Sequence, residues 1–319
     1  MPSSNTSTGG QPPALVVGLH HVALRVLNLD QAARFYGAAA GFAPWPAAGA
    51  LAESMGGLAL CAPNAGLLLL PAGAASEPVR RPVSEAGMAH LCLQTPAIQQ
   101  VVTQMTSLGA LLHSEPIDLG TGFLYCYARD PEHNVIEVEC VAPVWSDPRP
   151  WVAHANIVTH DLPRLCQFYS ALLGVEAVRS PRLRDDPRLD AIADLQGVQL
   201  RAAWLNAGNA QLELMQYLHP ATEAATGRRT PGAAGFAHIA FEVANLAAAC
   251  AHLRACGGAV EPAAGSKPWQ AMCTDPDGNH VLLLALDEES WRPLRIQSLA
   301  DPQITSRFAA ARAALPVSE

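Results

Sequence analysis

Four histidines occupy equivalent places in the chain, each near the start of a short apolar segment: His21, His90, His154 and His238. Imidazole binds divalent metals and exchanges protons near neutral pH, so these residues could support metal or acid–base chemistry. A single histidine in such a place more often makes a structural hydrogen bond. Four in register favour a functional interpretation for His90 and His154 and leave His21 and His238 open between the two.

Two glutamates lie in similarly apolar surroundings. Glu213 stands between Leu212 and Leu214, and Glu137 follows Asn134 by three residues. A carboxylate that points inward from an apolar strand is costly without a metal or another partner. If its side chain faces outward, each would be an ordinary solvated glutamate. Glu139 lies two residues after Glu137 and so would share its face of the strand.

The remaining histidines and the aromatic pairs receive a structural interpretation. Surface or turn positions are expected for seven histidines: His20, His113, His133, His160, His219, His252 and His280. For the pairs Phe35-Tyr36 and Phe168-Tyr169, a role in packing the helices against the core is favoured over a role in contacting a substrate.

These residues belong to an internal repeat of four units in the order A-B-A-B. Phe35 follows His21 by 14 residues, and Phe168 follows His154 by the same number. The second and fourth units instead share an Asp-Pro-x-x-Asn sequence, at 130–134 and 275–279. The chain therefore reads as a duplicated pair of units.

Each unit predicts a strand, a helix and then several strands. Apolar residues recur at helical spacing over 29–40, 98–108, 162–173 and 246–255, and a glycine closes each segment. Short apolar or alternating segments predict strands over 67–70, 123–128, 135–141, 198–205, 210–217 and 281–286. The two Asp-Pro-x-x-Asn sequences predict hairpin turns.

A βαβββ unit with a histidine on its first strand, a Phe-Tyr-x-x-x-x-Gly helix end and an Asp-Pro-x-x-Asn hairpin resembles the vicinal oxygen chelate superfamily. Its members include glyoxalase I, methylmalonyl-CoA epimerase, extradiol dioxygenases and bleomycin-resistance proteins. The resemblance covers residues 18 to 286. It implies an α+β fold in which four modules pair into two cupped mixed sheets, with metal ligands on the first and last strands of each module.

Length and composition fit two such paired domains. The 319 residues predict an N-terminal domain of modules 1 and 2 over 18–141 and a C-terminal domain of modules 3 and 4 over 151–286. Residues 1–17, rich in Ser, Gly and Pro, are expected to form a disordered leader. Residues 287–319 are expected to form a tail with a helix around 304–314.

The family pattern also implies where the acidic ligands lie, because each module can supply a glutamate from its last strand. The second module supplies Glu137 and the third Glu213. The fourth has Leu282 at the corresponding place, and the first has only leucines over 67–70. The two outer modules have therefore lost the acid.

Two ways of pairing the modules remain open. Pairing 1 with 2 and 3 with 4, as in extradiol dioxygenases, gives two sites of two histidines and one glutamate: His21, His90 and Glu137, and separately His154, Glu213 and His238. Pairing 1 with 4 and 2 with 3, as in single-chain four-module glyoxalases, gives one full site of His90, Glu137, His154 and Glu213 and an empty cup with His21 and His238. The second pairing is favoured because it explains why both outer modules lost their acids together.

Two imidazoles and two carboxylates suit a divalent ion such as Zn, Ni, Co, Mn or Fe. The set favours a glyoxalase- or epimerase-like lyase or isomerase that moves a proton beside a metal-bound carbonyl of a small molecule, with Glu213 as base and Glu137 as anchor. One alternative is an Fe(II)-dependent extradiol-type ring-cleaving dioxygenase with two histidines and one glutamate. A second alternative is a metal-free small-molecule binding or resistance protein.

Composition narrows the partners and the compartment. A net charge of −8 disfavours nucleic acid, which needs a basic face, and no apolar run approaches the length of a membrane span. The eight cysteines form no Cys-x-x-Cys pair, which indicates a reducing compartment and predicts the cytoplasm. A monomer or a homodimer is expected.

Overall fold

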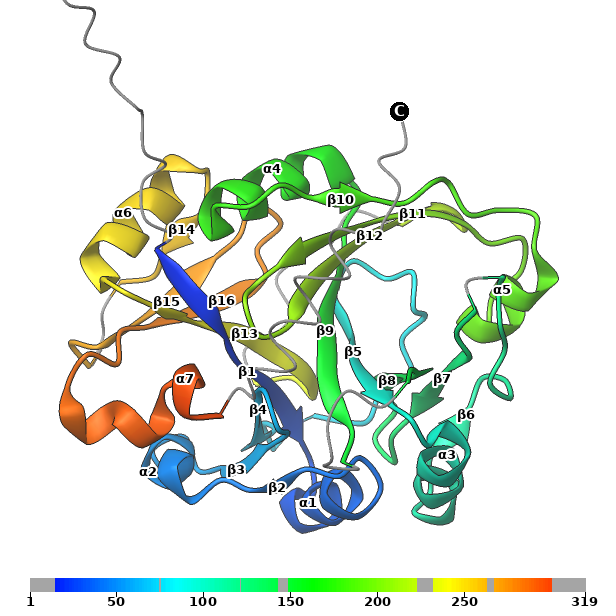
Figure 1. Ribbon diagram of the computed structural model, residues 1–319, viewed down its shortest axis with the longest axis horizontal. Coiled ribbons are helices and arrows are strands. Elements are labelled where there is room, and N and C mark those ends of the chain that lie inside the picture. The colour runs from blue at the N-terminus through cyan, green and yellow to red at the C-terminus, as the bar shows by residue number, and fades with distance from the viewer. Residues whose placement is uncertain are drawn as a thin grey trace, which may run out of the picture.

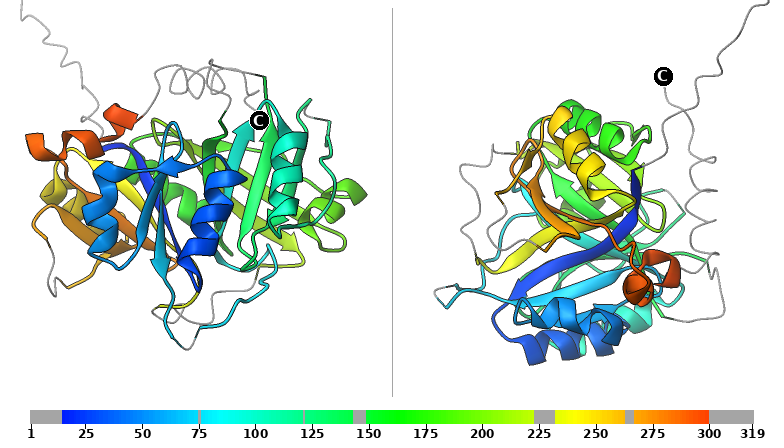
Figure 2. Two further views of the ribbon diagram at one scale, coloured as in Figure 1. Left: turned by 90° about the horizontal axis from the view of Figure 1, so that it is seen from below. Right: turned by 90° about the vertical axis from the view of Figure 1, so that its left-hand side faces the viewer.

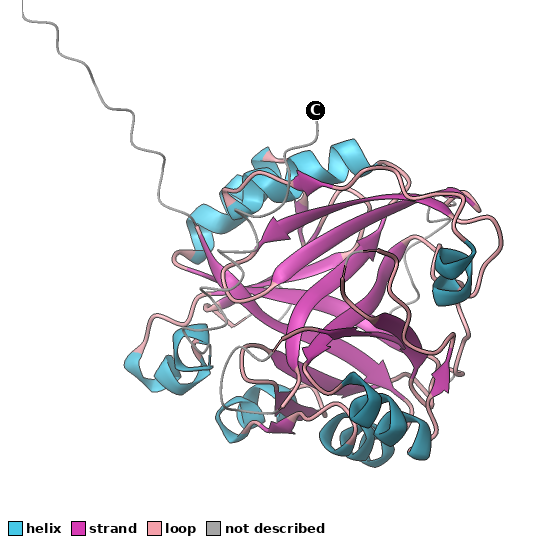
Figure 3. Ribbon diagram, turned by 45° about the vertical axis from the view of Figure 1, so that its right-hand side comes forward, coloured by secondary structure: helices cyan, strands magenta, loops and turns pink. Residues whose placement is uncertain are grey.

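The computed structural model describes residues 15–74, 76–120, 122–142, 149–222, 232–262 and 267–299. Most of the predicted leader and the predicted helix at 304–314 lie outside these residues. Two eight-stranded mixed sheets form the centre of the molecule, and the helices lie around them (Figures 1 and 3). The predicted α+β class is confirmed.

The 1/4 sheet, named for its modules, combines strands from the two ends of the chain. Its order is β14 (Ala259–Val260), β15 (Gln270–Thr274), β16 (His280–Leu284), β13 (Gly235–Val243), β1 (Val16–Val26), β4 (Gly66–Pro71), β3 (Leu58–Cys61) and β2 (Ala43–Pro44). β1 begins at Val16, so its first two residues fall within the predicted leader. At the centre of the sheet β1 and β13 pair antiparallel, and β4 and β16 flank them in parallel.

The 2/3 sheet repeats this plan with the two inner modules. Its order is β10 (Val178–Arg179), β11 (Gln199–Asn206), β12 (Gln211–His219), β9 (Trp151–Val158), β5 (Gly87–Thr95), β8 (Val135–Cys140), β7 (Tyr125–Arg129) and β6 (Leu111–Leu112). The strand orders therefore pair module 1 with 4 and module 2 with 3. Each sheet uses both halves of the chain, and a division into domains at 18–141 and 151–286 stays a prediction.

Four amphipathic helices cover the outer faces of the sheets: α1 (Leu29–Ala38), α3 (Ile98–Ser107), α4 (Leu162–Leu173) and α6 (Leu246–Ala255). The side chains of Asn28, Asp161 and Asn245 cap three of them by accepting a backbone N–H bond from the first turn. In the right view of Figure 2, α4 and α6 lie on the side of the molecule opposite α1. None of the described helices is long and apolar enough to cross a membrane.

The sequence did not predict several short elements. They are η1 (Pro46–Ala48), α2 (Gly49–Glu53), α5 (Pro187–Ala193), η2 (Glu289–Leu294), α7 (Ile296–Leu299), the strands β3 and β15, and the four two-residue strands at the sheet edges. The main apolar core lies between the four long helices and the two sheets. The opposite face of each sheet carries smaller apolar clusters and also the histidines of the four modules.

One hydrogen bond in each half of the chain joins an A-type module to the B-type module that follows it. The Tyr36 hydroxyl group donates to Asp130 Oδ2 at 2.9 Å, and the Tyr169 hydroxyl group donates to Asp275 Oδ2 at 3.0 Å. All four residues are buried. The other oxygen of each aspartate accepts two backbone N–H groups of its own hairpin turn. The Phe-Tyr and Asp-Pro-x-x-Asn motifs are thus two sides of one contact.

We expect Tyr36→Phe and Tyr169→Phe each to lower the free energy of unfolding by about 1–2 kcal/mol, because a buried carboxylate loses a donor. Urea denaturation measures this loss. Tyr125→Phe is the control, since its ring is half-exposed and its hydroxyl group has no such aspartate partner. If Tyr36→Phe and Tyr169→Phe unfold at the wild-type urea concentration, the bonds do not hold the modules together.

Candidate metal centre

The concave face of the 2/3 sheet brings together His90, Glu137, His154 and Glu213. His90 and His154 lie on the two central strands, β5 and β9, whose antiparallel register places Cys92 opposite His154. Glu137 on β8 pairs with Cys92, and Glu213 on β12 pairs with Asn156, so both acids lie level with the histidines. The four residues predicted for one site are the four that meet.

Their side chains converge on a single point. The two Nε2 atoms of His90 and His154 lie 3.3 Å apart. Glu137 Oε2 is 3.0 Å from each Nε2, and Glu213 Oε2 is 3.3 Å from each. All four donor atoms lie within 4.8 Å of one another. The cluster is buried, and the Glu137 side chain is the most accessible at 12%.

Hydrogen bonding alone does not account for this arrangement. Each Nε2 carries at most one hydrogen, so two protons at most would serve five contacts of 3.0–3.3 Å among four atoms rich in lone pairs. A shared cation with bonds of about 2.1 Å places neighbouring ligand atoms roughly 3 Å apart. The donor types and spacing therefore fit a divalent metal ion.

Two neighbouring side chains hold the cluster in place. Asn156, fully buried, donates from Nδ2 to Glu213 Oε2 at 2.8 Å. The Cys92 thiol hydrogen-bonds to the His154 ring. Such outer contacts orient metal-binding residues. Sequence reasoning missed both, although each follows a cluster histidine by two residues and so shares its face of the strand.

Burial and mutual attraction act in opposite directions on the ionisable groups. Burial alone would lower the pKa of His90, but hydrogen bonds and attraction from Glu137 and Glu213 outweigh it and raise the pKa above 6.5. Burial would raise the pKa of Glu213, but attraction and hydrogen bonds from His154 and His90 lower it well below 4.5. Without a metal, the cluster therefore holds protonated imidazole beside carboxylate.

The equivalent face of the 1/4 sheet keeps the histidines without the acids. His21 Nε2 lies 3.1 Å from His238 Nε2. The register places Leu68 where β12 has Glu213, and Leu282 where β8 has Glu137. The predicted loss of both acids from one site is thus visible at equivalent strand positions.

This second face is filled by the protein's own side chains, so the expected empty cup is wrong. Leu282 packs with Trp45 and Leu294, and Leu68 packs with Leu51 and the partly buried Trp269. Four of these residues lie outside the predicted strands of the repeats: Trp45 directly before η1, Leu51 in α2, Trp269 directly before β15 and Leu294 in η2. Apolar packing replaces the charged cluster.

His20 is a second correction, because it is buried and not on the surface. A bulge in β1 at this residue turns its ring inward. Its Nδ1 lies 2.8 Å from Nδ1 of His21. Its Nε2–H group donates to the Leu294 carbonyl oxygen at 2.9 Å. Burial lowers the pKa of His20 to about 4 and that of His238 to about 3, so this histidine chain is neutral.

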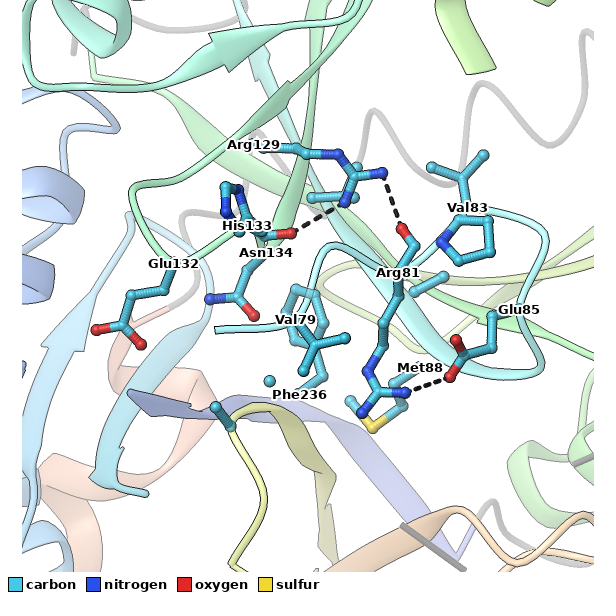
Figure 4. Close-up of a pocket in the computed structure, with 15 residues that line it drawn as sticks. Val79, Arg81, Val83, Glu85, Met88, Arg129, Glu132, His133, Asn134 and Phe236 are labelled. Atoms are coloured by element: carbon cyan, nitrogen blue, oxygen red, sulfur yellow. Dashed lines mark hydrogen bonds and ion pairs between the residues drawn. The ribbon is translucent and has the colours of Figure 1, made fainter. Parts of the chain in front are cut away.

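The other six histidines stay away from both clusters. His160 and His219 are exposed, and His113, His133, His252 and His280 are half-buried. One of them, His133, lines a pocket together with Arg129, Phe236 and other residues (Figure 4). Arg129 is buried there and donates to His113 Nε2 and to two backbone carbonyl groups. These bonds satisfy its guanidinium group from within the protein, and the His–Glu cluster is not part of the pocket lining.

The family model for the Glyoxalase/Bleomycin resistance protein/Dioxygenase superfamily matches residues 18–138 and 151–283. The chain belongs to this superfamily. The resemblance predicted from the repeats is therefore confirmed. No match is found among curated protein sequences.

Solved structures of the superfamily share its fold. Glyoxalase I from Zea mays is 18% identical, with a TM-score of 0.60 over 84% of this chain and 92% of that one. A proposed dioxygenase from Bacillus subtilis is 12% identical, with a TM-score of 0.58 over 96% of this chain and 98% of that one. At these identities the likeness establishes architecture, and the activity must be argued from the site.

The shifted pKa values predict how pH affects the metal-free protein. Because the folded pKa of His90 is raised, its stabilisation is complete below pH 6.5 and is lost as pH rises through the folded pKa. Because that of Glu213 is lowered, its stabilisation is present above pH 4.5 and is lost as pH falls. Chelator-treated protein should therefore unfold more readily at pH 8 than at pH 6 in urea titrations. His90→Gln should reduce this alkaline decline and leave the contribution of His154, whose pKa is also raised. A decline of wild-type size in that variant would contradict the assignment.

Proposed function

We propose that this protein is a divalent-metal-dependent lyase or isomerase that transfers a proton beside a carbonyl group of a small molecule. The convergence of four donor atoms at 3.0–3.3 Å on one sheet face is the observation that supports it most. His90, His154, Glu137 and Glu213 would hold the ion. When bound, the ion would act as a Lewis acid on a carbonyl or enolate oxygen.

The chain's own groups would supply the proton transfer. Glu213 is our choice of base, because Asn156 and the cluster both engage its Oε2 atom and leave Oε1 to take a proton from the substrate carbon. Glu137 would anchor the ion through Oε2, which contacts both histidines. The apolar residues around the cluster would limit water at the reacting carbon.

The two ligand sets that the other module pairing predicted for a dioxygenase each include His21 or His238. The 1/4 sheet places these two histidines next to Leu68 and Leu282 and not beside an acid. Four protein donors also leave about two positions on a six-coordinate ion, which is crowded for catechol and dioxygen together. In a metal-free binding protein, protonated imidazole would have to compensate the buried carboxylates in place of an ion.

Elemental analysis of the purified protein tests the metal. We expect about one divalent ion per chain, loss of the ion in Glu213→Ala, and retention in His238→Ala, which changes the histidine of the other sheet that corresponds to His90. Metal content per folded chain is the readout. A metal-free wild-type protein, or loss of metal in His238→Ala with retention in His90→Ala, would contradict the proposed centre.

Isotope exchange tests the reaction. Metal-loaded enzyme in deuterated water should incorporate deuterium into a 2-oxo thioester or hemithioacetal, and Glu213→Gln should lower this rate by about two to four orders of magnitude. Mass spectrometry follows the exchange, and Glu137→Gln shows whether the two acids differ. Oxygen consumption with a yellow ring-cleavage product from catechols would instead favour the dioxygenase.

A further inference from the structure

A buried arginine without an acidic partner lines the pocket of Figure 4. Arg129, on β7, is 2% exposed. Its side chain donates to His113 Nε2 at 2.9 Å and to the carbonyl oxygens of His133 and Arg81 at 3.1 and 2.9 Å. All three acceptors are neutral, because burial lowers the pKa of His113. Among the described residues, no carboxylate forms an ion pair with this guanidinium group.

The two acids that attract Arg129 make their own bonds elsewhere. Asp194 pairs with Arg80 at 2.6 Å. Asp130 accepts hydrogen bonds from Tyr36 and from its own turn. Burial and repulsion from Arg80 lower the pKa of Arg129, although Asp194 and Asp130 act in the opposite direction. A buried charge with so little compensation is unfavourable unless an anion lies beside it.

The two glutamates of the pocket lining are engaged as well. Glu85 Oε1 pairs with Arg81 Nη1 at 2.6 Å. The carboxylate of Glu132 accepts the backbone N–H groups of Leu27 and Asn28. Figure 4 shows Arg81 reaching toward Glu85, and Glu132 pointing away from Arg129. The pocket therefore combines a buried positive charge with acids that are held at its edge.

His133 also lines the pocket and has two unusual features. Its backbone φ is 70°, a left-handed conformation that few residues other than glycine favour. Its Nδ1 atom is buried and has no hydrogen-bond partner among the described residues. At the equivalent positions of the module 4 hairpin, Gly278 replaces His133 and Thr274 replaces Arg129. The hairpin itself thus requires neither residue.

The size of the pocket limits the ligand. Its volume is about 40 Å³. A single buried water needs roughly 10–15 Å³, so the pocket has room for about three or four non-hydrogen atoms. Val79, Met88 and Phe236 form its apolar side. A small carboxylate suits these surroundings, because its charge would compensate Arg129 and its oxygen atoms accept hydrogen bonds.

We infer that this pocket is a binding site for a carboxylate of about the size of acetate, which Arg129 attracts and to which the Nδ1–H group of His133 donates. None of the four residues of the His–Glu cluster lines the pocket. The site is therefore separate from the proposed metal centre and does not depend on it.

Isothermal titration calorimetry with sodium acetate tests the site, and acetamide is an uncharged probe of the same size. At an ionic strength fixed with sodium chloride, protein as purified and chelator-treated protein should both bind acetate and not acetamide. Arg129→Met, which keeps most of the side-chain bulk, should weaken acetate binding about ten- to a hundredfold, the effect of a lost bond to a charged group. Arg292→Met, at an exposed arginine of η2, is the control and should bind acetate like wild type.

His133→Gly is a second variant, with the residue that the module 4 turn already has at this place. It should fold like wild type and bind acetate about three- to tenfold more weakly, the effect of one lost hydrogen bond. Wild-type protein without saturable acetate binding, or Arg129→Met with wild-type affinity, would overturn the inference. Unchanged affinity in His133→Gly would overturn it even if Arg129→Met does not fold. Acetate binding that disappears with the metal would place the anion at the metal centre and overturn it too.

Discussion

The antiparallel pairing of β5 with β9 is the constraint on which the site depends. It brings the first strands of two modules side by side, so that His90 and His154 face one point from opposite directions. The last strands, β8 and β12, run parallel to these central strands and deliver an acid at the same level. Sheet register, rather than any loop, thus fixes the four donors, and rigid strands suit a site that must hold its geometry.

The two sheets share one arrangement of strands but carry different residues on their equivalent faces. In the 2/3 sheet the acids make the concave face a charged cluster, while in the 1/4 sheet Leu68 and Leu282 occupy the matching positions. Two carboxylates buried near one another require positive charge as compensation. With leucine at both positions this requirement is absent, and tryptophan and leucine side chains from α2, from η2, from the residue before η1 and from the sheet close the face.

The three buried histidines on the apolar face of the 1/4 sheet form hydrogen bonds with one another and with the backbone. His20, His21 and His238 form a chain of imidazoles that ends at the Leu294 carbonyl oxygen. Three neutral rings can satisfy one another in this way, because each imidazole has one donor and one acceptor nitrogen. A histidine pair at equivalent strand positions is therefore compatible with either a metal centre or a sealed core, and the acids decide between them.

Sequence patterns were sufficient for whatever depends on local periodicity or repetition. α4 and α6 have the predicted bounds, and the cluster residues follow from the offsets within each repeat. Features that depend on distant contacts were missed. The bulge that buries His20 has no local signal, and the Tyr36–Asp130 bond joins residues 94 positions apart. β3 and β15 are short and partly exposed, so their alternation is weak. A cytoplasmic location and the oligomeric state stay predictions.

Anomalous X-ray diffraction from crystals soaked with a transition metal tests the central claim most directly, because it locates ions without reference to activity. The account predicts one strong peak per chain, within bonding distance of His90 Nε2, His154 Nε2, Glu137 Oε2 and Glu213 Oε2. It predicts no peak between His21 and His238. A peak beside those two histidines, or none at the four-residue cluster, would contradict it.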